Sequence, residues 1–406
     1  MNNKLHRFTL LGSLVFALAA NATDIKNLQA GTLKDCQISP EETALTISGQ
    51  MDASDFFYIF DNLNALEELN ISAVQIIPYN GQPLNYTSLS TSEANAIPDY
   101  ALTGLVNLKS IVLPTSLQKI GRGAFSGSGI TSIEIPQGVT IVGDYAFMRC
   151  NELTSIQIPT SVSTLGTRAF AYCSKLEEVQ MLADIQTIPE GLFEACGGIK
   201  ELYFDGLAQC TEIGQWALAE CNGIETLVLP FNAQIIEKAA LYGTTKIQTL
   251  ELPENLNFID NNAMTGMTEL NTLNVSNVQY IPELGENVWG RMDKSAVTLI
   301  TPNDLVSEYK NTEQWQEFNV VSLDEWRDIT HNITVIGNSS LTIAVQNGKL
   351  VISSGKDNLN LVSIYNIAGT RITYANAGQK VEFNVENWPR GVYLVVTGIG
   401  AAKISI

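Results

Sequence analysis

Side chains able to support nucleophilic or acid–base catalysis are scarce in this sequence. Its histidines are His6, close to the start, and His331, late in the chain. A Ser-His-Asp or Cys-His site needs a histidine base that a third group holds in place, and no such set accompanies His331. The sequence also lacks HExxH, GxSxG and a phosphate-loop Gly-Lys pattern. We therefore expect no catalytic residue, no cofactor and no bound metal.

The best remaining candidates for acid–base chemistry are two carboxylates, Glu178 and Glu201. If they occupy neighbouring strands they can meet, and like charges held together favour protonation of one or loose binding of a cation. A pair adjacent in sequence, such as Glu177 and Glu178, instead points to opposite faces of a strand. A glycan or peptide hydrolase that uses face carboxylates is therefore one alternative for this chain, and the sequence offers nothing further in its favour.

Four of the six cysteines recur at a regular spacing: Cys150, Cys173, Cys196 and Cys221 are 23, 23 and 25 residues apart. Equivalent positions in adjacent repeats lie about 5 Å apart with side chains in parallel, which does not favour a disulfide. Four ligands in one row cannot surround a metal tetrahedrally. We expect a column of buried thiols. A framework of three disulfides is the alternative that export would allow.

The elements that position all these residues are copies of one short repeat. Eight copies run from Ile97 to Ile281, and each begins with an apolar residue. A period this steady predicts a solenoid, in which each unit buries its apolar face against its neighbours. The copies begin at residues 97, 120, 142, 165, 188, 213, 236 and 259, with a ninth start at 281.

Each repeat has two halves with different patterns. In the copy that begins at Val142, a short turn leads to Ala146 and Phe147, which we expect in the core. The second half alternates Leu153, Ile156 and Ile158 like a half-buried strand, and Pro159 ends it. Stacked copies predict a curved solenoid with a parallel ladder of short strands and one open face.

Two columns of side chains should lie on that open face. The first contains Ser110, Ser132, Ser155, Glu178, Glu201, Thr226, Thr249 and Thr272, and the second begins at Val112. Extended surfaces of this kind bind partners in many solenoids, and Tyr203 is the best aromatic anchor. The alternative is an ordinary solvated strand surface. The candidate binding face comprises Glu134, Gln157, Glu178, Gln180, Glu201, Tyr203, Val228, Glu251 and Asn274.

The pattern I-x-x-x-A-F-x-x-C-x-x-L-x-x-I-x-I-P resembles the BspA-like leucine-rich repeats of surface and secreted proteins of Bacteroidetes and some other microbes. The resemblance covers roughly residues 45–321. It implies a binding module for a protein or a glycan, in adhesion or in contact with host or matrix proteins. It names no ligand.

The regions around the repeats divide as follows. Residues 1–22 are expected to form a signal peptide, with a basic start at Lys4 and Arg7, an apolar run and cleavage after Ala22. No other segment has the length and apolarity to cross a membrane. The remaining regions are an N-terminal cap with an irregular first repeat at 23–96, the solenoid at 97–296, a C-terminal cap at 297–321 and a connector at 322–340.

Residues 341–406 change character, with four strand-like blocks separated by turns, and predict a small antiparallel β-sandwich. This part resembles the C-terminal sorting domain of type IX secretion cargo. The resemblance implies export across the outer membrane by secretion and anchoring machinery, with possible exchange of the domain for a lipopolysaccharide anchor. The residues that carry it are Tyr365, Gly369, Arg371, Gly391 and Tyr393.

The charge balance narrows the range of partners. Acidic residues number 42 against 23 basic ones, for a net charge of −19. An acidic chain repels phosphate backbones and anionic membrane surfaces, so neither nucleic acid nor such a membrane is an expected partner. We expect an exported, non-enzymatic binding protein, secreted or associated with the outer membrane, with the periplasm as the fallback. A self-assembling surface-layer component is the structural alternative.

Overall fold

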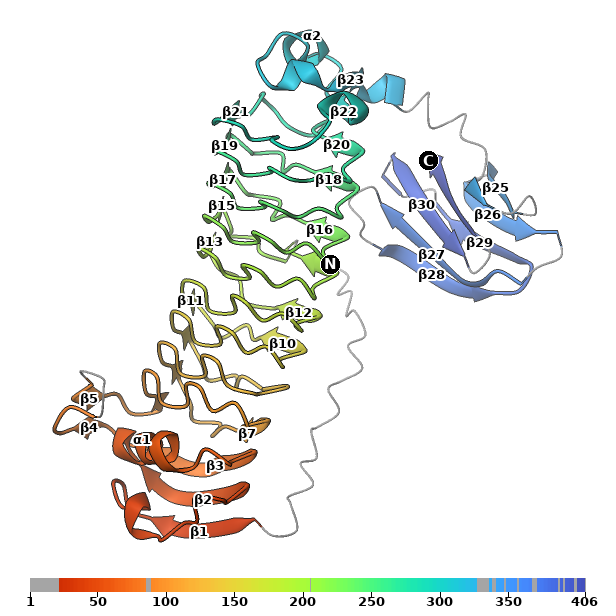
Figure 1. Cartoon of the computed structure of the whole chain (residues 1–406). Helices are drawn as coiled ribbons and strands as arrows, with labels where there is room; N and C mark the ends of the chain where they lie inside the picture. The colour runs from red at the N-terminus through yellow and green to blue at the C-terminus, as the bar shows by residue number, and fades with distance from the viewer. Residues whose placement is uncertain are drawn as a thin grey trace. The chain divides into compact units, whose positions relative to one another are not determined.

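The computed structural model (Figure 1) describes residues 22–84, 89–204, 206–326, 336–337, 341–346, 348–355, 358–366, 371–385, 388–389, 391–397 and 400–405. The chain divides into two compact units, residues 1–174 and residues 175–406. The predicted solenoid of parallel strands followed by an antiparallel β domain is confirmed.

Unit 1 opens with a parallel sheet of four strands in the order β1 (Thr23–Leu28), β2 (Ala44–Met51), β3 (Glu68–Ile76) and β7 (Ser110–Val112). Strand β1 was not predicted, because its mixed polar sequence suits an edge strand and shows no clear alternation. The 3-10 helix η1 (Leu33–Asp35) and helix α1 (Ala53–Asn62) cover this end. Asp52 and Asp55 form a capping box at the start of α1.

The carboxylate of Asp55 also fastens the loop before it. It accepts hydrogen bonds from the backbone N–H groups of Gly31 at 2.8 Å and Leu33 at 2.9 Å. Its side chain is buried, and burial raises the pKa of its carboxyl group although these N–H donors oppose the shift. These bonds hold the loop at 31–33 against α1 within the cap at 23–96. It also contains a small hairpin, β4 (Tyr79–Asn80) with β5 (Thr91–Ser92).

Between residues 96 and 284 the turns of the solenoid form two ladders of strands, of which only one was predicted. The first ladder is the expected one and forms the open face. The second consists of strands two residues long at the start of each repeat, and Figure 1 shows the two ladders on opposite sides of the turns. In unit 1 the second ladder contains β6 (Ala96–Ile97), β8 (Lys119–Ile120), β9 (Ile141–Val142) and β11 (Thr164–Leu165), and the first continues with β10 (Ser155–Ile158).

Unit 2 repeats this arrangement. Its first ladder contains β12 (Glu178–Met181), β14 (Glu201–Tyr203), β16 (Thr226–Val228), β18 (Thr249–Glu251), β20 (Thr272–Asn274), β22 (Thr298–Thr301) and β23 (Asn319–Ser322). Its second ladder contains β13 (Thr187–Ile188), β15 (Glu212–Ile213), β17 (Ile235–Ile236), β19 (Phe258–Ile259) and β21 (Glu283–Leu284). The ninth repeat start predicted at Ile281 is wrong, because Leu284 pairs with Ile259 instead.

Between the two ladders each turn makes a third set of hydrogen bonds. The backbone N–H groups of Tyr145, Phe147 and Arg149 donate to the carbonyls of Thr167, Ala169 and Ala171 in the next turn, at 2.7–2.9 Å. Tyr145 and Arg149 adopt left-handed backbone conformations with φ of 57° and 60°. Such conformations are costly outside glycine, and the inter-turn hydrogen bonds offset that cost.

The core of each turn contains the residues that the repeat pattern predicts. Phe125, Phe147 and Phe170 are fully buried and stack in parallel, with ring centroids 5.2 Å and 5.1 Å apart. All six cysteines are free thiols, and those of the column are fully buried. The expected column of thiols, rather than a disulfide framework, is what the structure contains.

Aromatic residues close the C-terminal end of the solenoid, as expected for a cap. Trp289, Trp315, Tyr309 and Phe318 are buried and in mutual contact, with ring centroids 5.3–6.1 Å apart. The elements of this cap are η2 (Lys294–Ala296), α2 (Val306–Tyr309) and η3 (Trp315–Glu317).

The C-terminal domain is an antiparallel two-sheet structure with a core of residues such as Leu350, Ile352, Val362, Ile364 and Val395. Three of the four predicted blocks are hairpins rather than single strands. The connector predicted at 322–340 is also too long, because residues 336–337 form an edge strand of the domain. One sheet contains β24 (Ile336–Gly337), β31 (Gly400–Ser405), β30 (Val392–Thr397), β27 (Asn360–Asn366) and β28 (Arg371–Ala377), and the other β25 (Leu341–Gln346), β26 (Lys349–Ser354) and β29 (Lys380–Asn384).

Candidate functional site

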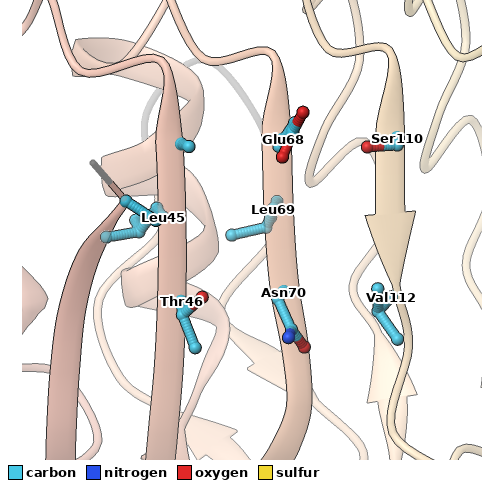
Figure 2. Close-up of a pocket in the computed structure, with 9 residues that line it drawn as sticks. Leu45, Thr46, Glu68, Leu69, Asn70, Ser110 and Val112 are labelled. Atoms are coloured by element: carbon cyan, nitrogen blue, oxygen red, sulfur yellow. The ribbon is translucent and has the colours of Figure 1, made fainter. Parts of the chain in front are cut away.

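The candidate site is the strand face, defined as the outward-pointing residues of the first ladder. In unit 1 it begins earlier than predicted, because β2 and β3 are in register with β7. Ala44, Glu68 and Ser110 form one row. Thr46, Asn70 and Val112 form the next row (Figure 2). The contributions of β2 and β3 to this face were not predicted, although Leu45-Thr46-Ile47 and Leu69-Asn70-Ile71 alternate like the later strands.

Further along unit 1 the predicted positions lie on this face. Ser132 and Ser155 pair directly across a parallel bridge. Glu134 is exposed and Gln157 is half-buried. In this unit the positions predicted from spacing therefore lie in columns on the strand face. Their side chains carry hydroxyl, amide and carboxylate groups.

A shallow pocket lies at the N-terminal end of the strand face. Its cavity volume is only about 20 Å³, close to the size of one water molecule. Leu45 and Leu69 lie beneath it, point into the core between the two outward rows and are only 1% exposed. Figure 2 shows the Ser110 hydroxyl turned toward the strand that carries Glu68. The residues that line the pocket are Ala22, Ala44, Leu45, Thr46, Glu68, Leu69, Asn70, Ser110 and Val112.

In unit 2 the predicted residues form the face as far as β16. Glu201 is exposed, and the Tyr203 hydroxyl donates to its Oε2 at 3.0 Å along the same strand. Tyr203 is paired in register with Val228 of β16. Glu178 is exposed at the start of β12, and Gln180, two residues later, is half-buried. Tyr203 and Glu201 thus present a ring and a carboxylate that hold each other in place.

The strand face closes at β20, where Thr272 and Asn274 are buried, although Thr249 of β18 is still exposed. Asn274 is only 4% exposed, because its Oδ1 accepts from the backbone N–H of Ser276 as the chain folds over it. Glu251 is partly covered, with Oε2 buried and Oε1 accepting from Asn277 Nδ2 at 2.6 Å. Burial raises the pKa of the Glu251 carboxyl group, against the opposing effect of the Asn277 hydrogen bond. Asn274, predicted on the open face, is therefore buried instead.

The charge on the strand face has one sign. Its charged members are Glu68, Glu134, Glu178, Glu201 and Glu251, and no lysine or arginine occupies either column. In the described part of the chain, none of these five carboxylates makes an ion pair within 4.0 Å. Their unpaired charges make this face attractive to a cationic group.

The residues that the structure describes give no support to a metal site or to a membrane-spanning helix. Within those ranges no cluster of His, Cys, Asp or Glu side chains could hold a metal ion. Every helix there is too short or too polar to span a bilayer. His331 lies outside the described residues.

The residues of the sorting-domain pattern are placed in part. The Tyr393 hydroxyl donates to the Pro389 carbonyl at 2.6 Å, and its ring lies 5.1 Å from that of Trp388. Tyr365 is half-buried in β27 and pairs in register with Arg371, the first residue of β28. Gly391 directly precedes β30, and Gly369 lies outside the described residues. Tyr393 therefore fixes the turn that begins at Trp388.

The solved structures that match this chain are only distantly similar to it. A leucine-rich repeat protein from Bacteroides ovatus is 21% identical, with a TM-score of 0.43, over 68% of this chain and 59% of that one. One from Eubacterium ventriosum is 16% identical, with a TM-score of 0.40, over 64% and 60%. A leucine rich cell surface protein from Faecalibacterium prausnitzii is 16% identical, with a TM-score of 0.28, over 65% and 82%. The chain spans about three fifths of the length of the first two proteins.

Sequence families give a clearer result. No curated protein matches the chain. Residues 95–222 and 204–288 match the BspA type leucine rich repeat region, in six copies. Residues 339–405 match the secretion system C-terminal sorting domain. Both resemblances expected from the sequence are confirmed. Residues 95–288 therefore belong to the BspA-type leucine-rich repeats, and residues 339–405 form a secretion system C-terminal sorting domain.

Proposed function

We propose that this chain is an exported, non-enzymatic binding protein that holds a protein ligand, such as a host or matrix protein, against its strand face. The combination of leucine-rich repeats with a secretion sorting domain supports binding and export as its two tasks. The observation that carries the binding task is the open face itself. Glu201 and Tyr203 project from hydrogen-bonded strands and bond to each other, so they are ordered before a ligand arrives.

The test compares capture of a panel of extracellular matrix proteins by purified residues 23–406 and by strand-face variants. Glu201→Lys and Tyr203→Ala should each weaken capture roughly tenfold, as the loss of a central anchor does. Glu283→Lys makes the same charge change at an exposed position of the second ladder, and it should leave capture intact.

Three results would contradict this proposal. Equal losses in Glu201→Lys and Glu283→Lys, with capture by Tyr203→Ala unchanged, would show that net charge, rather than the strand face, governs capture. Binding to an array of glycans, without binding to any protein, would replace the protein ligand with a glycan. Concentration-dependent assembly without any ligand would favour a self-assembling surface layer.

We also propose that the sorting domain directs export and is removed or exchanged for an anchor. The test is fractionation of the native cells, with mass spectrometry of both chain ends. A surface or medium fraction that begins at Thr23 and ends before Leu341 is the expected result. A periplasmic chain that retains Ile406 would contradict active sorting.

A further inference from the structure

We propose that a second surface of the solenoid, the arginine–tyrosine face of unit 1, binds a carboxylate-bearing sugar at the end of a glycan. This face comprises Tyr100, Arg122, Tyr145, Arg149 and Tyr172, which belong to four consecutive turns. It follows the third set of hydrogen bonds rather than the first ladder, so the inference goes beyond the proposed function. None of these residues was among the positions predicted for binding.

The backbone beneath this face gives the first reason to assign it a ligand. Each turn between residues 97 and 174 places two residues in left-handed conformations. Glycine adopts them without steric cost and holds three of the positions: Gly104, Gly123 and Gly127. The others, with φ of 53–63°, are all tyrosine or arginine: Tyr100, Tyr145, Arg149, Arg168 and Tyr172. Large side chains placed where glycine would carry less strain indicate a functional surface.

The equivalent positions of unit 2 show no such preference. Besides glycine they hold small, acidic and amide side chains as well as aromatic and basic ones: Ala195, Trp216, Glu220, Ala239, Asn262, Asn287 and Arg291. The left-handed backbone of the solenoid therefore does not itself require tyrosine or arginine. Their concentration belongs to unit 1.

The tyrosine rings hold two guanidinium groups in place. Arg122 Cζ lies 5.3 Å from the centroid of the Tyr145 ring, and Arg149 Cζ lies 5.7 Å from that of Tyr172. A guanidinium that stacks by its face keeps the N–H donors of its edge available, and this planar fork matches the two oxygens of a carboxylate. Because the forks are positioned in advance, a ligand is bound at a lower ordering cost.

The two arginines are also available to an anion. Both are exposed, and within the described ranges no carboxylate lies within 4.0 Å of either guanidinium. Asp99 and Asp144 hold the repeat position of Arg122 in the adjoining turns, but their Oδ1 atoms accept from the backbone N–H groups of Arg122 and Thr167 at 2.8 Å and 3.0 Å. Three lysines of the same unit, by contrast, each pair with a carboxylate: Lys26, Lys109 and Lys119.

The surface around the arginines suits a sugar better than a peptide. Tyr100 and Tyr172 are 37% and 36% exposed, so parts of their rings are open to the C–H face of a sugar. Gly104 and Gly127 hold the repeat position of Arg149 in the two preceding turns, and a Cβ on either would meet nothing closer than 3.9 Å. A sugar can lie on such open surface, whereas peptides are usually held by a strand edge or a groove. A chain of net charge −19 repels polyanions, which favours a ligand with one carboxylate.

The test titrates purified residues 23–406, with isotope-labelled tyrosine rings, with sialyllactose, a trisaccharide that ends in a carboxylate-bearing sugar. The NMR signals of the Tyr145 and Tyr172 rings, assigned from Tyr145→Phe and Tyr172→Phe, should shift. Lactose lacks the charged sugar and should bind at least roughly tenfold more weakly. Equal binding of the two sugars would overturn the proposal, because the arginines would then recognise nothing.

Substitution of Arg149 separates a role in binding from a role in folding. Arg149→Gly should weaken sialyllactose binding roughly tenfold. Its urea midpoint should stay close to that of the native chain, because glycine relieves the left-handed strain and Gly127 holds the same repeat position. Arg149→Lys keeps the charge but not the fork, so it should also weaken binding. Native binding by Arg149→Lys, or a clear fall in the urea midpoint of Arg149→Gly, would contradict the proposal.

A matched control is available in unit 2. Arg291 holds the repeat position of Arg149, is left-handed, and lies 5.5 Å from the centroid of the Tyr242 ring. The Glu220 carboxylate, however, lies 3.0–3.2 Å from a Cβ placed on Gly243, next to that ring. Arg291→Gly should therefore leave sialyllactose binding unchanged. Equal weakening by Arg291→Gly and Arg149→Gly would show general attraction to positive charge and would overturn the proposal.

Two further results keep this inference distinct from the other readings of the chain. Glu201→Lys should bind sialyllactose as the native chain does, even where it loses capture of a matrix protein. If capture stands but sialyllactose shifts neither ring, this inference alone fails. If a blocked peptide with one central glutamate shifts the rings and sialyllactose does not, the partner is an acidic protein segment and the proposal is overturned.

Discussion

The Cys150 thiol donates a hydrogen bond to the backbone carbonyl of Phe125, one turn back along the solenoid, with Sγ and O 3.1 Å apart. Cys173 makes the same contact with the Phe147 carbonyl at 3.2 Å. In unit 2, Cys221 makes it with Phe193 at 2.9 Å. The recurring cysteine is therefore a compact buried donor that links one turn to the next, and this role explains why it recurs without forming disulfides.

Replacing one of these thiols should destabilise the solenoid. In Cys173→Ala the Phe147 carbonyl loses a donor and the core loses the sulfur atom, so we expect a loss of about 1.5 kcal/mol in unfolding free energy. Cys173→Ser keeps a donor and should lose less than half as much, since Ser128 occupies the same repeat position naturally. Urea denaturation followed by circular dichroism measures both. Equal losses would show that packing, rather than the hydrogen bond, is what matters.

The same burial should protect the thiol column from alkylation. Burial raises the pKa of the Cys150 thiol, and it raises that of Cys221 to about 12, so few thiolates form near neutral pH. The pKa of Cys36 is also raised by burial, but its side chain is half-exposed. Iodoacetamide treatment of the folded protein, followed by peptide mass spectrometry, should modify Cys36 first. Modification of Cys150 or Cys221 at an equal rate would contradict this prediction.

The repeat period and the open face could be predicted because each rests on a sequence pattern that recurs over many residues. Eight copies fix the register, and alternation such as Leu153, Ile156 and Ile158 identifies the strand. The second ladder could not be predicted, because strands of two residues, such as Lys119–Ile120, are too short to show alternation. The third set of hydrogen bonds was missed because Tyr145 and Arg149 occupy left-handed positions where a sequence pattern would call for glycine.

The candidate site was predicted in outline and missed in detail for a similar reason. Spacing places Glu201 and Tyr203 on the open face, and the structure agrees. Spacing cannot show that the chain after Asn274 folds back over this residue, because a local hydrogen bond to Ser276 decides it. It also cannot show that Thr46 and Glu68, in irregular opening turns, line a pocket with Ser110.

Stability should depend on pH through Glu251. Burial raises the pKa of its carboxyl group in the folded state, so the folded chain holds that proton more tightly than the unfolded chain. Ionisation then costs stability as pH rises from the usual carboxyl range through the raised pKa. Relative to the Glu251→Gln variant, the native chain should lose stability across that window. Glu225→Gln changes an exposed position, and its unfolding free energy should change with pH in the same way as that of the native chain. If the difference in unfolding free energy between Glu251→Gln and the native chain stays constant with pH, this prediction is wrong.

Two glycines should separate the cost of the left-handed backbone from the cost of crowding. A Cβ added to Gly104 or to Gly206 would meet no atom within 4 Å, but only Gly104 has a positive φ, of 66°. Gly104→Ala should therefore destabilise the fold by about 1 kcal/mol through backbone strain alone. Gly206→Ala should be neutral or slightly stabilising, because it restricts the unfolded chain without strain. Urea denaturation of both variants provides the measurement. Equal effects would show that the left-handed positions, including those held by Tyr145 and Arg149, carry no conformational cost in this solenoid.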